Sequence, residues 1–169
     1  MRLFVAVWPP PDVVDQLAAI ERPARPGIRW TTEDQWHVTL RFLGEEEAER
    51  VKASLVQMRP TGRKPLVAQA GPALERLGPS ILCVPVAGLD DLANAVQAAT
   101  ASLGARPDDR PFRGHLTIAR ARRGVNPRPP TPTPFSASWA VAEVTLVASA
   151  LHPTGARYQV IERYPLGAS

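Results

Sequence analysis

Apolar residues gather in short runs bounded by proline, glycine and polar residues, and this pattern predicts β-strands near 2–8, 36–43, 65–70, 80–86, 114–121, 135–150 and 157–164. We expect the run at 135–150 to be broken. Between the strands, apolar residues recur at helical spacing in three segments, which predicts helices over 12–20, 45–58 and 90–103. Most strand pairs are therefore expected to be separated by helices or long loops.

Two of the predicted strands carry the same tetrapeptide pattern. Residues 37–40 read His-Val-Thr-Leu, and residues 115–118 read His-Leu-Thr-Ile. Because successive side chains of a strand point to opposite faces, the His and the Thr of each motif project together, while the intervening apolar residue points into the core. Two such motifs facing each other could hold a tetrahedral anion between two imidazoles and two hydroxyls.

The motifs belong to a longer repeat. His115 lies 78 positions after His37, and the same offset superimposes the apolar run 3–8 on the run 81–86. Each copy reads as a strand, a turn, a short amphipathic helix, a polar loop with proline and arginine, and the His-containing strand. The copies then diverge, the first into a charged helix and the second into a proline-rich loop at 126–134. This pattern indicates an approximate internal two-fold relation.

The chain holds a single cysteine, Cys83, within an apolar strand pattern. It excludes an intramolecular disulfide and is expected to be a buried, inert thiol. One cysteine and three separated histidines lack the spacing of a familiar metal site. Pro85, in the same run, predicts that this strand is an edge strand or carries a bulge.

Length and composition suit one compact domain or two intimate lobes, since the chain has 169 residues, of which 44% are hydrophobic. No apolar run approaches the twenty or so residues that span a bilayer. The apolar start meets three consecutive prolines at 9–11, so it is typical of a first strand rather than of a signal peptide. We therefore expect a cytoplasmic protein with no membrane partner.

The charge points toward phosphate. The net charge is only +4, but all except two of the 20 basic residues are arginine, whose planar fork of donors fits phosphate oxygens. Seven arginines surround the second motif, which indicates an RNA-backbone or phosphate footprint; solvated surface charge is the alternative. They are Arg106, Arg110, Arg113, Arg120, Arg122, Arg123 and Arg128.

Four blocks in order, at 2–6, 36–44, 110–120 and 149–158, resemble the two-histidine phosphoesterase superfamily and, within it, the RNA 2′,3′-cyclic phosphodiesterases, also called 2′-5′ RNA ligases. The resemblance implies an α+β fold with one bilobal domain over 1–169. Two antiparallel sheets would face each other across a central cleft with pseudo-two-fold symmetry, helices would lie outside, and no metal or organic cofactor would be needed. Gly114 departs from the family, which usually has proline there, and we expect it to loosen the start of the strand.

The chemistry of such a site follows from its parts. Hydrolysis of a cyclic phosphate needs a base for water, an acid for the departing ribose oxygen, and donors for the non-bridging oxygens. His37 and His115 are the candidate acid and base, and Thr39 and Thr117 are the candidate phosphate-binding donors. The resemblance implies that His37 is the acid that releases the 3′ oxygen and His115 the base, which leaves a 2′-phosphate. The sequence itself does not orient the pair.

Phe42 and Arg120 each lie five residues after a motif histidine, an odd offset that strict alternation places on the opposite face. Either a bulge or the end of the strand turns them back, or they are a core aromatic and a solvated cation. The resemblance favours Phe42 as a base-stacking platform and Arg120 as a phosphate contact. His152 is interpreted as a surface residue, and Tyr158 as a packing residue.

The predicted function is metal-independent hydrolysis of RNA 2′,3′-cyclic phosphate ends, or of cyclic nucleotides, by a monomer. Three alternatives remain open at this point. They are 2′-5′ RNA ligation by the reverse chemistry, hydrolysis of a small-molecule cyclic phosphate, and binding of RNA ends without catalysis. Ligation requires a 5′-hydroxyl partner. Hydrolysis of a small-molecule cyclic phosphate predicts a preference for mononucleotides over oligonucleotides. A module that only binds RNA ends predicts binding without turnover.

Overall fold

The computed structural model describes residues 1–58, 66–129 and 131–167. In chain order the elements are β1 (Arg2–Val7), α1 (Pro11–Ala18), β2 (Ile28–Trp30), the 3-10 turn η1 (Glu33–Gln35), β3 (Val38–Glu45), α2 (Ala48–Val56), β4 (Val67–Ala70), β5 (Glu75–Leu77), β6 (Ile81–Ala87), α3 (Asp90–Ala99), β7 (His115–Ala121), β8 (Ala137–Ala140), β9 (Glu143–His152) and β10 (Gly155–Pro165).

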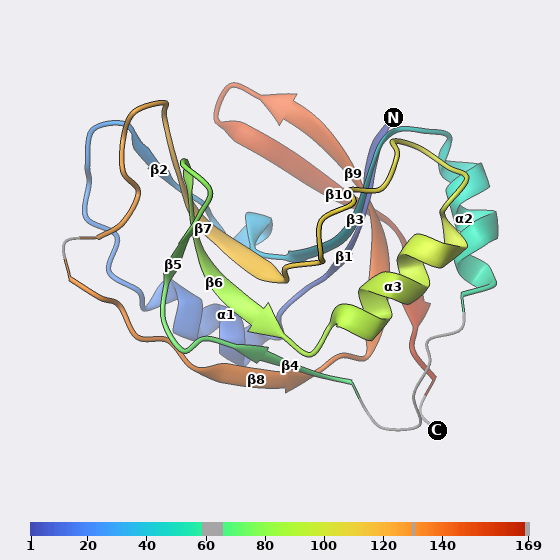
Figure 1. The fold of residues 1–169 in the computed structure, drawn as a ribbon, viewed down its shortest axis with the longest axis horizontal. Helices are drawn as coiled ribbons and strands as arrows, with labels where there is room; N and C mark the ends of the chain where they lie inside the picture. The colour runs from blue at the N-terminus through green and yellow to red at the C-terminus, as the bar shows by residue number, and fades with distance from the viewer. Residues whose placement is uncertain (59–65, 130, 168–169) are drawn as a thin grey trace.

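The strands form a curled antiparallel sheet of ten strands, in which β10-β9-β1-β3-β7-β6-β4-β8 is the main order, with β2 beside β7 and β5 beside β6 (Figure 1). The strands of the two motifs, β3 directly after His37 and β7 from His115 on, are neighbours at its centre, where Val38 of β3 pairs with Leu116 of β7. The α+β class is thus confirmed. The two sheets expected from the resemblance are joined at this pair as two halves of one sheet, and the place of β1 beside β3 matches that of β6 beside β7.

The helices connect the two halves of the sheet. Helix α1 follows β1 but contacts β8 of the other half, and α3 follows β6 but packs against β3 (Figure 1). Their apolar faces, including Val13 and Leu17 of α1 and Leu92 and Val96 of α3, belong to one core cluster shared by both halves. Burying these faces excludes water and stabilises the junction beside which both motifs lie.

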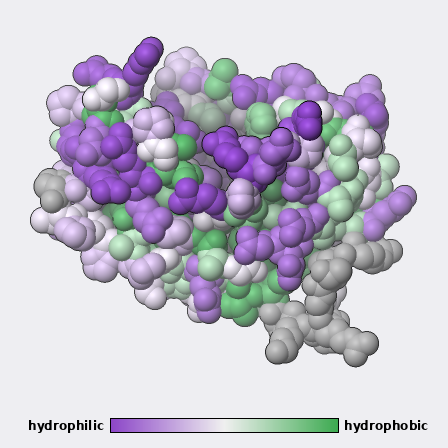
Figure 2. All heavy atoms as spheres, in the orientation of Figure 1, coloured by the Kyte–Doolittle hydropathy of each residue, from purple (hydrophilic) through white to green (hydrophobic). Residues whose placement is uncertain are grey.

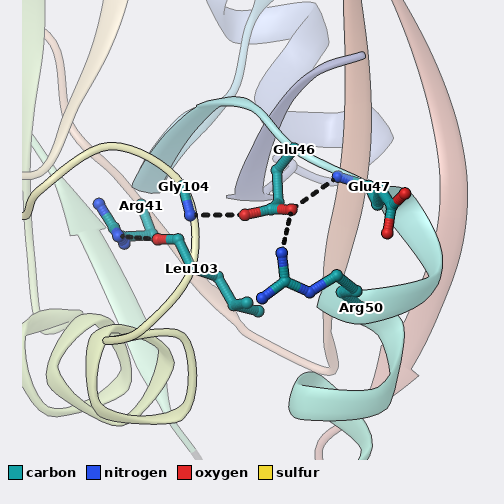
Figure 3. Close-up of polar contacts among 6 residues, drawn as sticks. All are labelled: Arg41, Glu46, Glu47, Arg50, Leu103 and Gly104. Carbon is teal, nitrogen blue, oxygen red and sulfur yellow. Dashed lines mark hydrogen bonds and ion pairs between the residues drawn. The ribbon is translucent and has the colours of Figure 1, made fainter.

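A group of hydrogen bonds from Arg41 and Glu46 also joins the two halves, beside β3 (Figure 3). The buried Arg41 guanidinium donates from Nη2 to the carbonyl oxygens of Leu103 (2.9 Å) and Ala105 (2.8 Å) in the loop after α3, and burial lowers its pKa. Nearby, a carboxylate oxygen of Glu46 accepts the backbone N–H of Gly104 at 2.8 Å. These hydrogen bonds hold the loop after α3, which leads to the second motif, against β3.

Most predicted elements are confirmed. The differences concern the bounds of elements and two short strands that were missed. The three helices are present, although α3 ends at Ala99 rather than at 103, and the predicted run at 135–150 is broken into β8 and β9. Strands β2 and β5, of three residues each, were not predicted. Residue 65 of a predicted strand and residue 130 of a predicted loop lie outside the described residues. Within the described residues no helix is both long and apolar enough to cross a membrane.

Strand β6 corrects one expectation about Pro85. The strand lies inside the sheet, between β7 on one side and β4 and β5 on the other, so it is not an edge strand. Its pairing with β7 has a register shift between Leu82 and Cys83, but the extra residue there belongs to β7 and not to the strand that contains Pro85. Near Pro85 the neighbour changes from β5 to β4, and the proline carbonyl accepts the N–H of Gly71 at 2.9 Å. Cys83 is buried as expected, and burial raises its pKa to about 11.

Candidate active site

A cavity of about 490 Å³ lies where the two halves of the sheet meet. Its lining includes residues from β1, β3 and β10 of one half and from β7 and β2 of the other. Every candidate site residue selected from the sequence lines it. These residues are His37, Thr39, Phe42, His115, Thr117 and Arg120.

The two imidazoles are held in the same way. Nδ1 of His37 lies 2.8 Å from the carbonyl oxygen of Gln35, and Nδ1 of His115 lies 2.8 Å from that of Arg113. Because a carbonyl only accepts, Nδ1 carries the hydrogen in both rings. The neutral form of each ring therefore has an unprotonated Nε2. In His37 this nitrogen lies 3.0 Å from Oγ1 of Thr39, whose hydroxyl donates to it.

His37 is enclosed by aromatic rings. Its ring centroid lies 4.8 Å from that of Phe4 and 5.2 Å from that of Trp8, and the ring of Tyr158 meets it edge-on at 5.0 Å. This burial disfavours the charged imidazolium. The pKa of His37 is lowered to about 4, mainly by burial. The hydrogen bond to the Gln35 carbonyl raises this pKa, and the positive charges of nearby groups lower it further. His37 is therefore neutral at neutral pH in the free protein.

A β-bulge in β3 explains the position of Phe42. The pairing of β1 with β3 passes from Thr39 to Arg41 and leaves Leu40 without an opposite residue. Because one extra residue reverses the alternation of faces, Phe42 falls on the same face as Thr39 despite its odd offset from His37. Phe42 is 47% exposed, and the Arg2 guanidinium lies 5.6 Å from its ring centroid. The alternative of a core aromatic is excluded.

An equivalent bulge in β7 explains the position of Arg120. The pairing of β6 with β7 passes from Thr117 to Ala119 and leaves Ile118 without an opposite residue. Ile118 occupies the same place in the second motif as Leu40 does in the first. Arg120 consequently faces the cavity together with Thr117. The matched bulges show that the repeat extends to the backbone conformation of both motifs.

The alignment of the first strands needs a shift of one residue. Phe4 lies opposite Phe42, and Ile81 lies opposite Arg120, so Phe4 corresponds to Ile81. The offset of 78 expected from the sequence pairs Phe4 with Leu82 instead. A continuous apolar run fits either alignment equally well, and only strand pairing distinguishes them.

The segment containing β2 and η1 contributes residues that the sequence did not reveal. Arg29, Thr31 and Gln35 all line the cavity. The buried Thr31 hydroxyl lies 2.8 Å from the carbonyl oxygens of both Thr117 and Ile118, and it accepts the indole N–H of Trp36 at 2.9 Å. Thr31 thus supports the β7 bulge. A strand of three residues has too little periodicity to be recognised.

Two residues near the C-terminus are closer to the site than expected. His152 is exposed, as predicted, but it also lines the cavity, where its Nδ1 lies 3.0 Å from Oγ1 of Thr154. Tyr158 packs as predicted, and the ring that it packs against belongs to His37. Burial raises the pKa of its phenol. Both reach the site because β10 pairs with β9, which pairs with β1.

The basic residues of the cavity come only in part from the arginine-rich stretch around the second motif. Of the seven arginines near the second motif, Arg120 lines the cavity, whereas Arg2 and Arg29 reach it from the N-terminal part of the chain. Arg110 instead forms an exposed ion pair with Asp108. Sequence proximity to the motif therefore identified Arg120 but not Arg2 or Arg29.

Gly114 precedes the second motif at a close approach of two backbones. Its carbonyl accepts the N–H of Val86 at 2.8 Å, and a Cβ at position 114 would lie only 2.4 Å from the Val86 carbonyl oxygen. The glycine therefore lets β6 lie close to the start of β7, and the expected loosening is not seen.

Comparisons with known proteins show which family this chain is similar to. The model of the family "LigT like Phosphoesterase" matches residues 7–69. An RNA 2′,3′-cyclic phosphodiesterase of Escherichia coli K12 is 35% identical over 98% of this chain and 96% of its own length. The enzyme of the same name from Thermus thermophilus is 32% identical over 98% and 90%. The crystal structure of E. coli LigT complexed with 3′-AMP has a TM-score of 0.77 at 31% identity, covering 98% of this chain and 97% of that chain.

Proposed function

Because the chain belongs to the LigT-like phosphoesterase family, we propose that it hydrolyses the 2′,3′-cyclic phosphate ends of RNA. The relatives that bear this activity in their names span nearly the whole chain. The observation that carries the proposal is the pair of imidazoles in one cavity, each oriented by a backbone carbonyl through Nδ1. Such a pair supplies an acid and a base to one phosphate.

The proposed reaction places the cyclic phosphate between the two histidines. His115 removes a proton from water, whose oxygen attacks phosphorus, and the bond from phosphorus to O3′ breaks. His37 gives its proton to O3′, so the product carries a 2′-phosphate and a free 3′-hydroxyl. Thr39 and Thr117 donate hydrogen bonds to the non-bridging oxygens, on which charge increases in the transition state.

The acid role of His37 requires that it hold a proton when substrate is bound. In the free protein the aromatic rings around it lower its pKa to about 4. A phosphate anion close to the ring favours the imidazolium and raises this pKa. We therefore propose that the substrate itself promotes protonation of His37, so that the acid forms only in the complex.

Two further residues of the cavity orient the RNA end in this proposal. Phe42 is exposed at the mouth of the cavity and offers its ring to the terminal base. Arg120 offers charge-assisted hydrogen bonds to a phosphate. The base and the phosphate would thus be held on opposite halves of the sheet.

The proposal predicts turnover without any added metal. Protein treated with EDTA should convert a dinucleotide ending in a 2′,3′-cyclic phosphate to the 2′-phosphate, as measured by separation of the 2′- and 3′-phosphate products. A 3′-phosphate product would contradict the proposed breaking of the bond from phosphorus to O3′. Tight binding without turnover at any pH would contradict the enzymatic proposal and support an RNA-end-binding module.

A further inference from the structure

Two arginines lie directly opposite each other beside the catalytic cavity. Arg29 of the short strand β2 pairs with Arg120 of β7. Like charges at directly opposite positions of an antiparallel pair destabilise it. Within the described ranges, neither guanidinium forms an ion pair with a carboxylate. Their charges are therefore left for an anion that the protein itself does not supply.

The same two arginines also line a second, neighbouring groove. A cavity of about 410 Å³ is lined by residues 27–29 and 120–122. Arg29 and Arg120 line both this groove and the catalytic cavity, so the two spaces adjoin at this pair of residues. Figure 2 shows hydrophilic residues gathered over this end of the molecule.

Arg122 extends the row of cations. It lies two residues after Arg120, and its backbone N–H donates to the carbonyl of Gly27 at 2.8 Å, which continues the β2–β7 pairing by one step. A Cβ at position 27 would lie 2.9 Å from Nε of Arg122. The Arg122 side chain therefore packs over Gly27, where a larger residue would displace it. Arg122 thus lies beyond the Arg29–Arg120 pair, outside the catalytic cavity, and lines the second groove with them.

We propose that Arg29 and Arg122, here called the arginine row, bind the phosphodiester that joins the terminal nucleotide of the RNA to the nucleotide before it. This inference rests on the proposed function, in which Arg120 contacts the phosphate of the RNA end. A cyclic mononucleotide has one phosphate, which the two histidines take. Only a longer chain has a second phosphate to place in the groove, so the arginine row selects RNA ends over free cyclic nucleotides.

The test compares three substrates that differ in this second charge. They are a 2′,3′-cyclic mononucleotide, a dinucleotide with the same cyclic end, and that dinucleotide with an uncharged methylphosphonate linkage. Arg29→Gln and Arg122→Gln should each raise KM for the charged dinucleotide about tenfold more than KM for the other two substrates, as expected for loss of a charge-assisted hydrogen bond. Arg123→Gln is the matched control, since it removes an exposed charge one residue away that lines neither cavity.

A comparison of substrates on the unmodified protein tests the proposal without relying on the folding of any variant. It should bind the charged dinucleotide more tightly than the methylphosphonate, and added salt should reduce this difference. Equal KM values for the two dinucleotides, or equal changes in both arginine variants on all three substrates, would overturn the arginine row. Failure to hydrolyse any of the three substrates would instead overturn the proposed function.

Discussion

Replacement of His37 or His115 by alanine should lower kcat on an RNA with a 2′,3′-cyclic phosphate end by at least about 10²-fold, without loss of the fold. The acid and the base have separate roles, and no neighbouring group replaces an imidazole. Single-turnover rates with each variant, together with its circular dichroism spectrum, measure this. His152→Ala is the matched control. It removes an exposed histidine that lines the same cavity but is hydrogen-bonded to Thr154, and should cost less than about tenfold.

The double variant His37→Ala/His115→Ala tests whether the two rings act as a unit. Its kcat should be little lower than that of the worse single variant, because residues that share one reaction step are not additive. Near-normal turnover in either single variant would contradict the two-histidine mechanism.

Replacement of Thr39 or Thr117 by valine should lower kcat by about 10- to 100-fold, which corresponds to roughly 1–3 kcal/mol. Valine keeps the β-branched shape and the strand preference, so the change isolates the hydroxyl. For Thr39 the loss includes the hydrogen bond to Nε2 of His37. Steady-state kinetics on the cyclic dinucleotide measure the effect.

Two controls accompany the threonine variants. Thr→Ser at either position keeps the hydroxyl and should be mild. Thr154→Val removes a hydroxyl outside the two motifs, bonded to His152, and should leave kcat nearly unchanged. An unchanged kcat in both Thr39→Val and Thr117→Val would remove the hydroxyls from the mechanism.

The repeated motif was enough to predict which side chains meet, but not how the strands bring Phe42 and Arg120 to them. Alternation within a strand correctly joined each His to its Thr. A bulge was one of the alternatives for both residues, but its position at Leu40 and at Ile118 could not be predicted, because both residues are apolar and a regular strand would accommodate them equally well. Strand pairing, which involves residues far apart in sequence, decides where an extra residue is placed.

The surroundings of His37 depend on contacts even more distant in sequence. Phe4 and Trp8 come from the first ten residues, and Tyr158 comes from β10. Nothing near position 37 in the sequence signals this enclosure or the lowered pKa that follows from it. Arg29 was missed for a different reason, since the strand that carries it has only three residues.

The pH dependence of kcat/KM, compared between the unmodified protein and His37→Ala, tests the paired acid and base most directly. The unmodified protein should give a bell-shaped profile on the cyclic dinucleotide, because one imidazole must be neutral and the other protonated. In His37→Ala only the base remains, and a base acts in its neutral form, so the residual activity should rise with pH and should then stay level. A residual activity that falls with rising pH would make His115 the acid, and an unchanged bell in the variant would contradict the account.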